Sequence, residues 1–359
     1  MRASDPCRAV GLWLLICCAM LWAMVSLGGV TRLLHAGLSI VEWRPITGLL
    51  PPLSEQEWRE AFQSYQKYPE YQKLHQGMSL PGFKSIFWLE YLHRLWGRFI
   101  ALVFLVPLLF FACTGRVTKA LFLRLLFAFL LGGLQGALGW YMVISGLVER
   151  PDVSQYRLTA HLGLALVLYA YLFWMALELL LRPAPYPDSR TNPPRKAAFL
   201  TLALIFLTAL SGGFVAGLDA GFAYNTFPLM GGRLIPEGLF LMCPVIRNFF
   251  ENLVTVQFDH RVLAMTLLVL IVWLWSQGSR MILPRRVRFA LGCLLAVALL
   301  QAALGIGTLL LRVPVPLAVA HQSGALLLLS AGLWVAYEFF NHKAGPPVRR
   351  ASPERCNAE

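Results

Sequence analysis

Long apolar stretches separated by shorter polar segments dominate the chain. Eight of them approach or reach the roughly 20 residues with which a helix spans the hydrocarbon core of a bilayer. In lipid the backbone must satisfy its own hydrogen bonds, so each stretch is predicted to be helical. The predicted spans are Gly11–Gly28, Ile86–Phe111, Ala120–Gly146, Leu158–Leu181, Ala197–Val215, Val254–Trp275, Phe289–Leu311 and Pro316–Phe340. The pattern indicates an all-α integral membrane protein with eight transmembrane helices.

Composition supports this class. Of the 359 residues, 58% are hydrophobic and only 14% charged, too few to cover a soluble globule, since soluble domains are typically about 25% charged. The first stretch is too long for the core of a signal peptide, so it is expected to remain as a helix.

Positive charge gathers in alternate connections and near both ends. The net charge of +13 therefore reflects the positive-inside bias of membrane proteins rather than binding of nucleic acid. The bias predicts that both termini are cytoplasmic. The basic residues concerned are Arg2, Arg8, Arg116, Lys119, Arg182, Arg190, Arg195, Lys196, Arg280, Arg285, Arg286, Arg288, Lys343, Arg349 and Arg350.

Two long connections, about Thr31–Ser85 and Leu218–Leu253, lie on the other side of the predicted membrane. Connections of this length usually have a function or contain helices of their own. Within the first, Ser54–Lys73 is amphipathic and is predicted to be helical as far as Pro69. His75, in the same connection, is expected to be a solvated side chain.

An internal repeat divides the chain. Gly28-Gly29 matches Gly212-Gly213, EYLHR matches QFDHR, LQGALG matches LQAALG, and Ala160-His161 matches Ala320-His321, all in the same order. The repeat predicts two tandem four-helix bundles, residues 1–190 and 191–345, followed by a polar cytoplasmic tail at 346–359. Because four helices return the chain to its starting side, the halves should be related by a pseudo-two-fold axis along the membrane normal.

Four histidines occupy equivalent positions in the repeat: His93 and His161 in the first half, His260 and His321 in the second. Each lies early in an even-numbered span, so all four are expected at one depth. Ionisable groups inside a membrane are costly and usually functional, although each could simply hydrogen-bond a neighbouring helix. Two inward-facing histidines in a four-helix bundle suit bis-histidine haem ligation. Copper or zinc would require further Cys, Met or carboxylate ligands, and none recurs in both halves.

Nearby residues suit a haem as well. Arg94, Arg98 and Arg261 follow the histidines and could bind propionates, or could extend toward lipid headgroups. Several glycines could admit a flat macrocycle or simply allow close helix packing. They are Gly132, Gly133, Gly136, Gly139, Gly305 and Gly307. Gln135 and Gln301 are interpreted as interior polar residues outside the haem layer.

The halves differ beside the first histidine of each pair. Glu90 lies one helical turn before His93, whereas its counterpart in the second half is Gln257. The first half is therefore predicted to carry out proton chemistry, with Glu90 as a proton acceptor or as a stabiliser of developing positive charge. A salt bridge from Glu90 to Arg94 or Arg98 is the structural alternative.

Three segments closely resemble the haem A synthase family: GGVTRLLHAGLSIVEWRPITGLLPPL, GMSLPGFKSIFWLEYLHRLWGR and NTFPLMGGRLIP. The resemblance extends from Gly28 to Phe340. It implies oxidation of a ring methyl group of haem O, by two successive hydroxylations, to the formyl group of haem A. It also implies a bacterial inner membrane location and a place in cytochrome oxidase assembly.

Carried over by position, the resemblance implies that His93 and His161 ligate the iron of the substrate haem O. It likewise implies that His260 and His321 ligate a bound haem B, and that Glu90 is the catalytic carboxylate. The implied partners are haem O synthase (a farnesyltransferase), cytochrome oxidase assembly factors and an unidentified electron-transfer partner; a homo-oligomer is left open. Some family members carry a cysteine pair in the first outer connection, but this chain has no Cys between Cys18 and Cys113.

Two other functions are alternatives. A di-haem electron carrier, such as a quinol-linked cytochrome b, would be expected to distribute its haems across the membrane rather than place four ligands near one face. A transporter built on a parallel repeat would show broken helices and polar groups near mid-membrane. Composition and spacing alone favour a di-haem protein and do not name a substrate. The family resemblance favours the haem-modifying enzyme.

Overall fold

The computed structural model describes residues 6–42, 48–148, 153–186, 193–341 and 343–344. Arg2, Arg190, Arg349, Arg350 and the predicted tail 346–359 lie outside the described residues.

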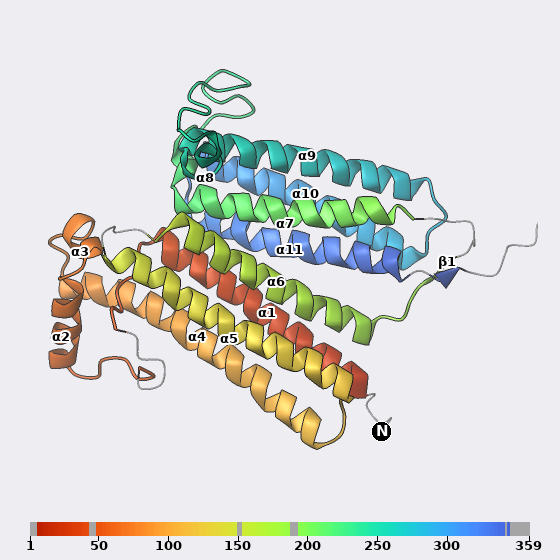
Figure 1. Cartoon of the computed structure of the whole chain (residues 1–359), viewed down its shortest axis with the longest axis horizontal. Coiled ribbons are helices and arrows are strands. Elements are labelled where there is room, and N and C mark those ends of the chain that lie inside the picture. The colour runs from red at the N-terminus through yellow and green to blue at the C-terminus, as the bar shows by residue number, and fades with distance from the viewer. Residues whose placement is uncertain (1–5, 43–47, 149–152, 187–192, 342, 345–359) are drawn as a thin grey trace, which may run out of the picture.

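Eight long helices form the body of the molecule (Figure 1). All eight are long and apolar enough to cross a membrane. The first half contains α1 (Pro6–Leu33), α4 (Leu80–Cys113), α5 (Lys119–Val148) and α6 (Gln155–Leu180); the second contains α7 (Arg195–Gly217), α9 (Leu253–Ser279), α10 (Arg285–Leu310) and α11 (Val315–Phe340). The prediction of an eight-helix membrane protein is confirmed.

Short elements cover one end of the bundle, which we call the capped end. They are α2 (Glu55–Tyr65), α3 (Pro69–Lys73), η1 (Ala220–Phe222), η2 (Val245–Arg247) and α8 (Asn248–Glu251). Ser54 caps α2 by accepting a hydrogen bond from the backbone N–H of Glu57. The predicted helix of the first connection is therefore present, but it ends at Tyr65, and Pro69 begins a separate helix.

At the opposite end, α1 begins and α11 finishes (Figure 1). Here β1 (Pro185–Tyr186), in the connection between the halves, pairs in parallel with β2 (Lys343–Ala344). Arg286 of α10 reinforces this end by binding the buried carboxylate of Glu338 on α11, with Nε 2.5 Å from Oε1.

The helix contacts fit the predicted symmetry. Between the halves, α1 packs against α11, α7 packs against α6, and α6 packs against α11. A two-fold axis that exchanges α1 with α7 and α6 with α11 would interchange the first two contacts and preserve the third. The arrangement therefore fits two bundles related along the membrane normal.

The apolar core lies on one side of the predicted histidine level. Its buried members include Leu14 of α1, Leu172 of α6, Leu274 of α9 and Phe339 of α11, all farther from the capped end than the histidines of the even-numbered spans. A second, aromatic cluster around Tyr65, Phe83 and Phe87 lies at the capped end. The four histidines therefore lie between an apolar core and a cap.

Candidate functional site

Three of the four histidines lie within the first eight residues of their helices, and His93 lies fourteen residues into the longer α4. His93 is on α4, His161 on α6, His260 on α9 and His321 on α11. All four helices begin at the capped end (Figure 1). This placement agrees with the single layer that the sequence predicts.

Each imidazole contacts a glycine on a neighbouring helix of the same half. A Cβ added at Gly28 of α1 would lie 3.1 Å from Nε2 of His93, and one added at Gly212 of α7 would lie 3.2 Å from Cε1 of His260. Separations this short require the neighbouring atom to move. Because Gly28 and Gly212 are equivalent in the repeat, both halves leave space for the first histidine in the same way.

The second histidine of each half has the same arrangement. A Cβ at Gly139 of α5 would lie 2.9 Å from Cε1 of His161, and one at Gly305 of α10 would lie 2.7 Å from Cε1 of His321. Gly139 and Gly305 are therefore required by the histidine rings, a role that the sequence analysis did not assign to any glycine.

Two glutamines hold the histidine backbones. The side-chain amide of Gln135 donates to the carbonyl of His161 at 2.9 Å, and that of Gln301 donates to the carbonyl of His321 at 2.8 Å. Each glutamine precedes its glycine by four residues, so both face the same neighbour. The interpretation that these glutamines lie outside the haem layer is wrong, because both bind the backbone of a histidine. The sequence could not show this, since it does not tell which helix each glutamine faces.

The second-half pair has a geometry that fits a haem iron. The ring centroids of His260 and His321 are 6.4 Å apart, and the ring planes are perpendicular. Two imidazole–metal bonds of about 2 Å, extended by the inner half of each ring, give a centroid separation of about 6 Å. The spacing of the two rings is therefore compatible with His260 and His321 together holding one haem iron.

Hydrogen bonding leaves ligand capacity on these rings. Nδ1 of His260 lies 2.8 Å from Oγ of Ser211, which orients the ring and leaves its other nitrogen available. Nδ1 of His161 and Nδ1 of His321 are buried without a hydrogen-bond partner in the described part of the chain, which is costly unless a ligand engages the ring. Within that part, no three His, Cys, Asp or Glu side chains gather to hold a metal. A macrocycle supplies the other ligands itself, so paired histidines fit a haem.

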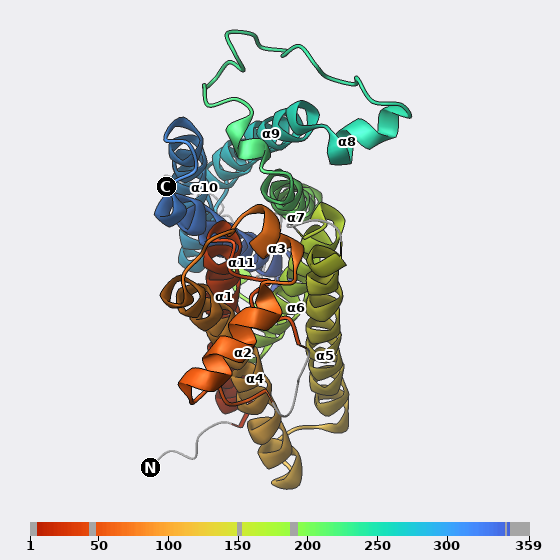
Figure 2. The same cartoon turned by 90° about the vertical axis from the view of Figure 1, so that its left-hand side faces the viewer.

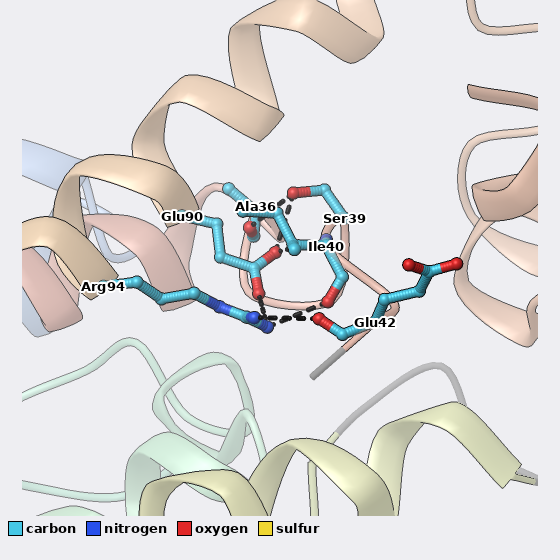
Figure 3. A network of polar contacts seen from close by, with 6 residues as sticks. All are labelled: Ala36, Ser39, Ile40, Glu42, Glu90 and Arg94. Atoms are coloured by element: carbon cyan, nitrogen blue, oxygen red, sulfur yellow. Dashed lines mark hydrogen bonds and ion pairs between the residues drawn. The ribbon is translucent and has the colours of Figure 1, made fainter. Parts of the chain in front are cut away.

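In the first half, Glu90 anchors the connection that follows α1 (Figure 3). Its buried Oε2 accepts hydrogen bonds from Oγ of Ser39 at 2.7 Å and from the backbone N–H of Ile40 at 2.8 Å. Oε1 forms an ion pair with Nη2 of Arg94 at 2.6 Å. The same guanidinium donates to the carbonyls of Ile40 and Glu42. The Glu90 carboxylate thus forms the salt bridge to Arg94 that was the structural alternative, and it also hydrogen-bonds the connection that follows α1.

In the second half, equivalent residues bind the corresponding loop with different chemistry. Gln257 donates through Nε2 to the carbonyl of Tyr224 at 3.0 Å. Arg261 donates to the carbonyls of Tyr224 and Thr226 at 2.9 and 2.8 Å. Nε of Arg261 is buried without a partner in the described residues, which leaves one donor for an anionic group.

The remaining predicted site residues lie nearby. Arg98 is partly buried on α4, one turn beyond Arg94. Gly132, Gly133 and Gly136 are exposed on α5, and a Cβ at any of them would meet no atom within 4 Å. Of the four predicted glycines on α5, three thus face open space and Gly139 contacts His161.

The cap contains a polar cluster that the sequence analysis missed. The hydroxyl of buried Tyr65 lies 3.0 Å from Oε2 of Glu70 and 2.7 Å from Nδ1 of His75. Burial and the neighbouring Glu70 carboxylate raise the pKa of Tyr65, and burial together with His35 lowers the pKa of His75. The expectation of a solvated His75 is therefore wrong, because the ring is partly buried and contacts Tyr65, the last residue of α2.

Fold and site together define a multi-pass membrane protein with a repeated pair of histidines at one level. Comparison with known proteins agrees. The family described as "Cytochrome oxidase assembly protein" matches residues 11–333. The heme A synthase of Nitrosospira multiformis is 53% identical over 333 residues, covering 92% of this chain and 93% of that protein.

Proteins of other organisms give similar matches. The chain is 50% identical over 331 residues to the heme A synthase of Nitrosomonas eutropha, covering 91% of this chain and 92% of that protein. It is 49% identical over 338 residues to the heme A synthase COX15 of Homo sapiens, covering 92% of this chain and 82% of that protein. The chain belongs to the haem A synthase family.

Proposed function

We propose that this protein is a haem A synthase, an oxidoreductase that converts a ring methyl group of haem O to the formyl group of haem A for terminal oxidases. Family membership supports the reaction. The observation that carries the proposal is the pair of histidines in each half, held against repeat-equivalent glycines at one level of the membrane. This arrangement suits two haems side by side.

The two haems are assigned by the difference between the halves. Residues 1–190 would hold haem O between His93 and His161, and residues 191–345 would hold haem B between His260 and His321. Glu90 supports this assignment, because a buried carboxylate is costly and its counterpart Gln257 avoids that cost. The half that retains the carboxylate is the one proposed to carry out the oxidation.

Each hydroxylation with water as the oxygen source forms a C–O bond and removes two electrons from the reacting carbon. It releases two protons, one from the C–H bond that breaks and one from the water. Glu90 is proposed to accept a proton or to stabilise the positive charge that develops there. Arg94 favours the ionised carboxylate through their ion pair, and Ser39 and Ile40 fix its direction. When bound, haem B would supply one-electron redox chemistry, and a membrane partner would take the electrons onward.

The connections support an orientation. Arg116, Lys119, Arg182 and Arg285 lie in or beside connections at the end opposite the cap. The positive-inside rule assigns that end to the cytoplasm. In this orientation both termini are cytoplasmic, and the cap lies on the outer side of the inner membrane.

The test is the identity of the haems in the purified protein. The protein is expressed in cells that make haem O, purified in detergent, and its haems are extracted and identified by mass. Haem B together with haem O, its hydroxylated forms or haem A supports the proposal. Haem B alone, unchanged in the presence of haem O, would indicate a di-haem electron carrier. His93→Ala is the matched control, because it should remove only the substrate haem.

A further inference from the structure

Each Gly-Gly pair of the repeat contacts both halves of the molecule. Gly28 contacts His93 of its own half, whereas a Cβ at the next residue, Gly29, would lie 2.8 Å from Oε1 of Gln322. Gln322 belongs to α11 of the other half and directly follows His321. One turn of α1 therefore contacts a histidine of the first half and the chain neighbour of a histidine of the second.

Hydrogen bonds tie α11 to α1 at this point. Nε2 of Gln322 donates to the carbonyl of Val25 at 2.7 Å. At the following residue, the carbonyl of Ser323 accepts from Nε1 of Trp22 at 2.9 Å, and its Oγ lies 2.7 Å from Oγ of Ser26. Three contacts from α1 thus hold the two residues that follow His321.

The equivalent contact, from α7 of the second half to α6 of the first, has no hydrogen bond. A Cβ at Gly213 of α7 would lie 2.9 Å from Oγ1 of Thr159, two residues before His161 on α6. That hydroxyl is buried without a hydrogen-bond partner in the described residues. In the repeat, Gln322 corresponds to Leu162, which has no polar group to bond α7. The polar connection therefore runs in one direction, from α1 of the first half to His321 of the second.

We propose that Gln322 is a positioning residue through which the state of the His93 site alters the environment of His321. The α1 helix contacts both sites over consecutive residues, so a displacement at Gly28 is transmitted to the residue next to His321. Close-packed interiors transmit such displacements. This inference rests on the proposed function only in requiring a haem between His260 and His321.

The experiment measures that haem directly. Gln322→Met keeps the length of the side chain and removes the amide. The low-spin electron paramagnetic resonance signal and the midpoint potential of the second-half haem are recorded in purified wild type, Gln322→Met, His93→Ala and the double variant. We expect each single variant to shift both readouts, and the double variant to equal Gln322→Met, because one pathway is interrupted twice.

Controls separate coupling from a general loss of structure. Leu162→Met introduces the same residue at the repeat-equivalent position and should leave the second-half signal unchanged. Gly29→Ala, which crowds Gln322, should reproduce the shift, whereas Gly292→Ala, where a Cβ meets nothing within 4 Å, should not. The comparison of Gly29→Ala with Gly292→Ala also provides the test if Gln322→Met fails to fold.

Haem present with identical signals in wild type and Gln322→Met, or shifts that add in the double variant, would overturn the coupling alone. A wild-type protein without haem on His260 and His321 would overturn the proposed function and the coupling with it.

Discussion

The two halves bind the loop above their first histidine with hydrogen bonds of opposite sense. Glu90 accepts from the loop through its carboxylate, whereas Gln257 donates to the loop through its amide. The arginine that follows the first histidine of each half, Arg94 or Arg261, donates to loop carbonyls. Because a neutral amide holds the second loop, anchoring alone does not require a charge. We propose that the carboxylate of Glu90 has an additional role, in the reaction.

The largest expected effect is the loss of a different haem from each half. His321→Ala should remove most of the haem of the second half. His260 and His321 are spaced to hold one iron between them, so the loss of either ring removes one of its two protein ligands. His161→Ala should instead remove the substrate haem. Haem extraction and absorbance spectra of the purified variants provide the measurement, and an unchanged haem B content in His321→Ala would contradict the assignment.

The next prediction concerns the differing position itself. Glu90→Gln copies the second half and should keep both haems while lowering haem A formation by about 10²–10⁴-fold, the usual contribution of acid–base catalysis. Turnover is measured by chromatography of extracted haems. Ser39→Ala is the control, since it removes a loop hydrogen bond and leaves the carboxylate. An equal loss of turnover in Ser39→Ala would assign the effect to the loop.

A third prediction tests what the halves share. Gly305→Ala and Gly139→Ala should each displace a histidine, and each should lower the free energy of unfolding by about 1–3 kcal/mol, the usual cost of overpacking. Thermal unfolding in detergent and haem content measure the effect. Gly136→Ala, with nothing within 4 Å, should be nearly neutral. Equal effects of Gly136→Ala and Gly139→Ala would rule out the specific histidine contact.

The smallest effect is expected at Ser211. Ser211→Ala removes the hydrogen bond to Nδ1 of His260, which is worth about 1 kcal/mol, and should shift the spectrum of the second-half haem without removing it. The counterpart in the first half is Leu27, so Leu27→Ala has no histidine hydrogen bond to lose. A second-half spectrum identical to wild type in Ser211→Ala would show that this bond does not tune the ligand.

Much of the architecture could be predicted because apolar length and the repeat constrain it strongly. The eight helices follow from hydropathy, and the four histidines stand out since ionisable groups are scarce in such helices. The roles of Gly28 and Gly139 could not be predicted, because glycine serves helix packing equally well. The loop contacts of Glu90 depend on the conformation of residues 34–42, including the positive φ of 46° at His35, which no periodicity encodes.

The paired contacts α1–α11 and α7–α6 have a consequence for the origin of the chain. A single four-helix half would expose this surface, and a second copy related by a two-fold axis would cover it with the same surface. A half-length ancestor could thus assemble as a homodimer before duplication joined the copies. In the single chain the two halves differ at such positions: Gln322 corresponds to Leu162, and Glu90 corresponds to Gln257. Identical subunits could not have these differences.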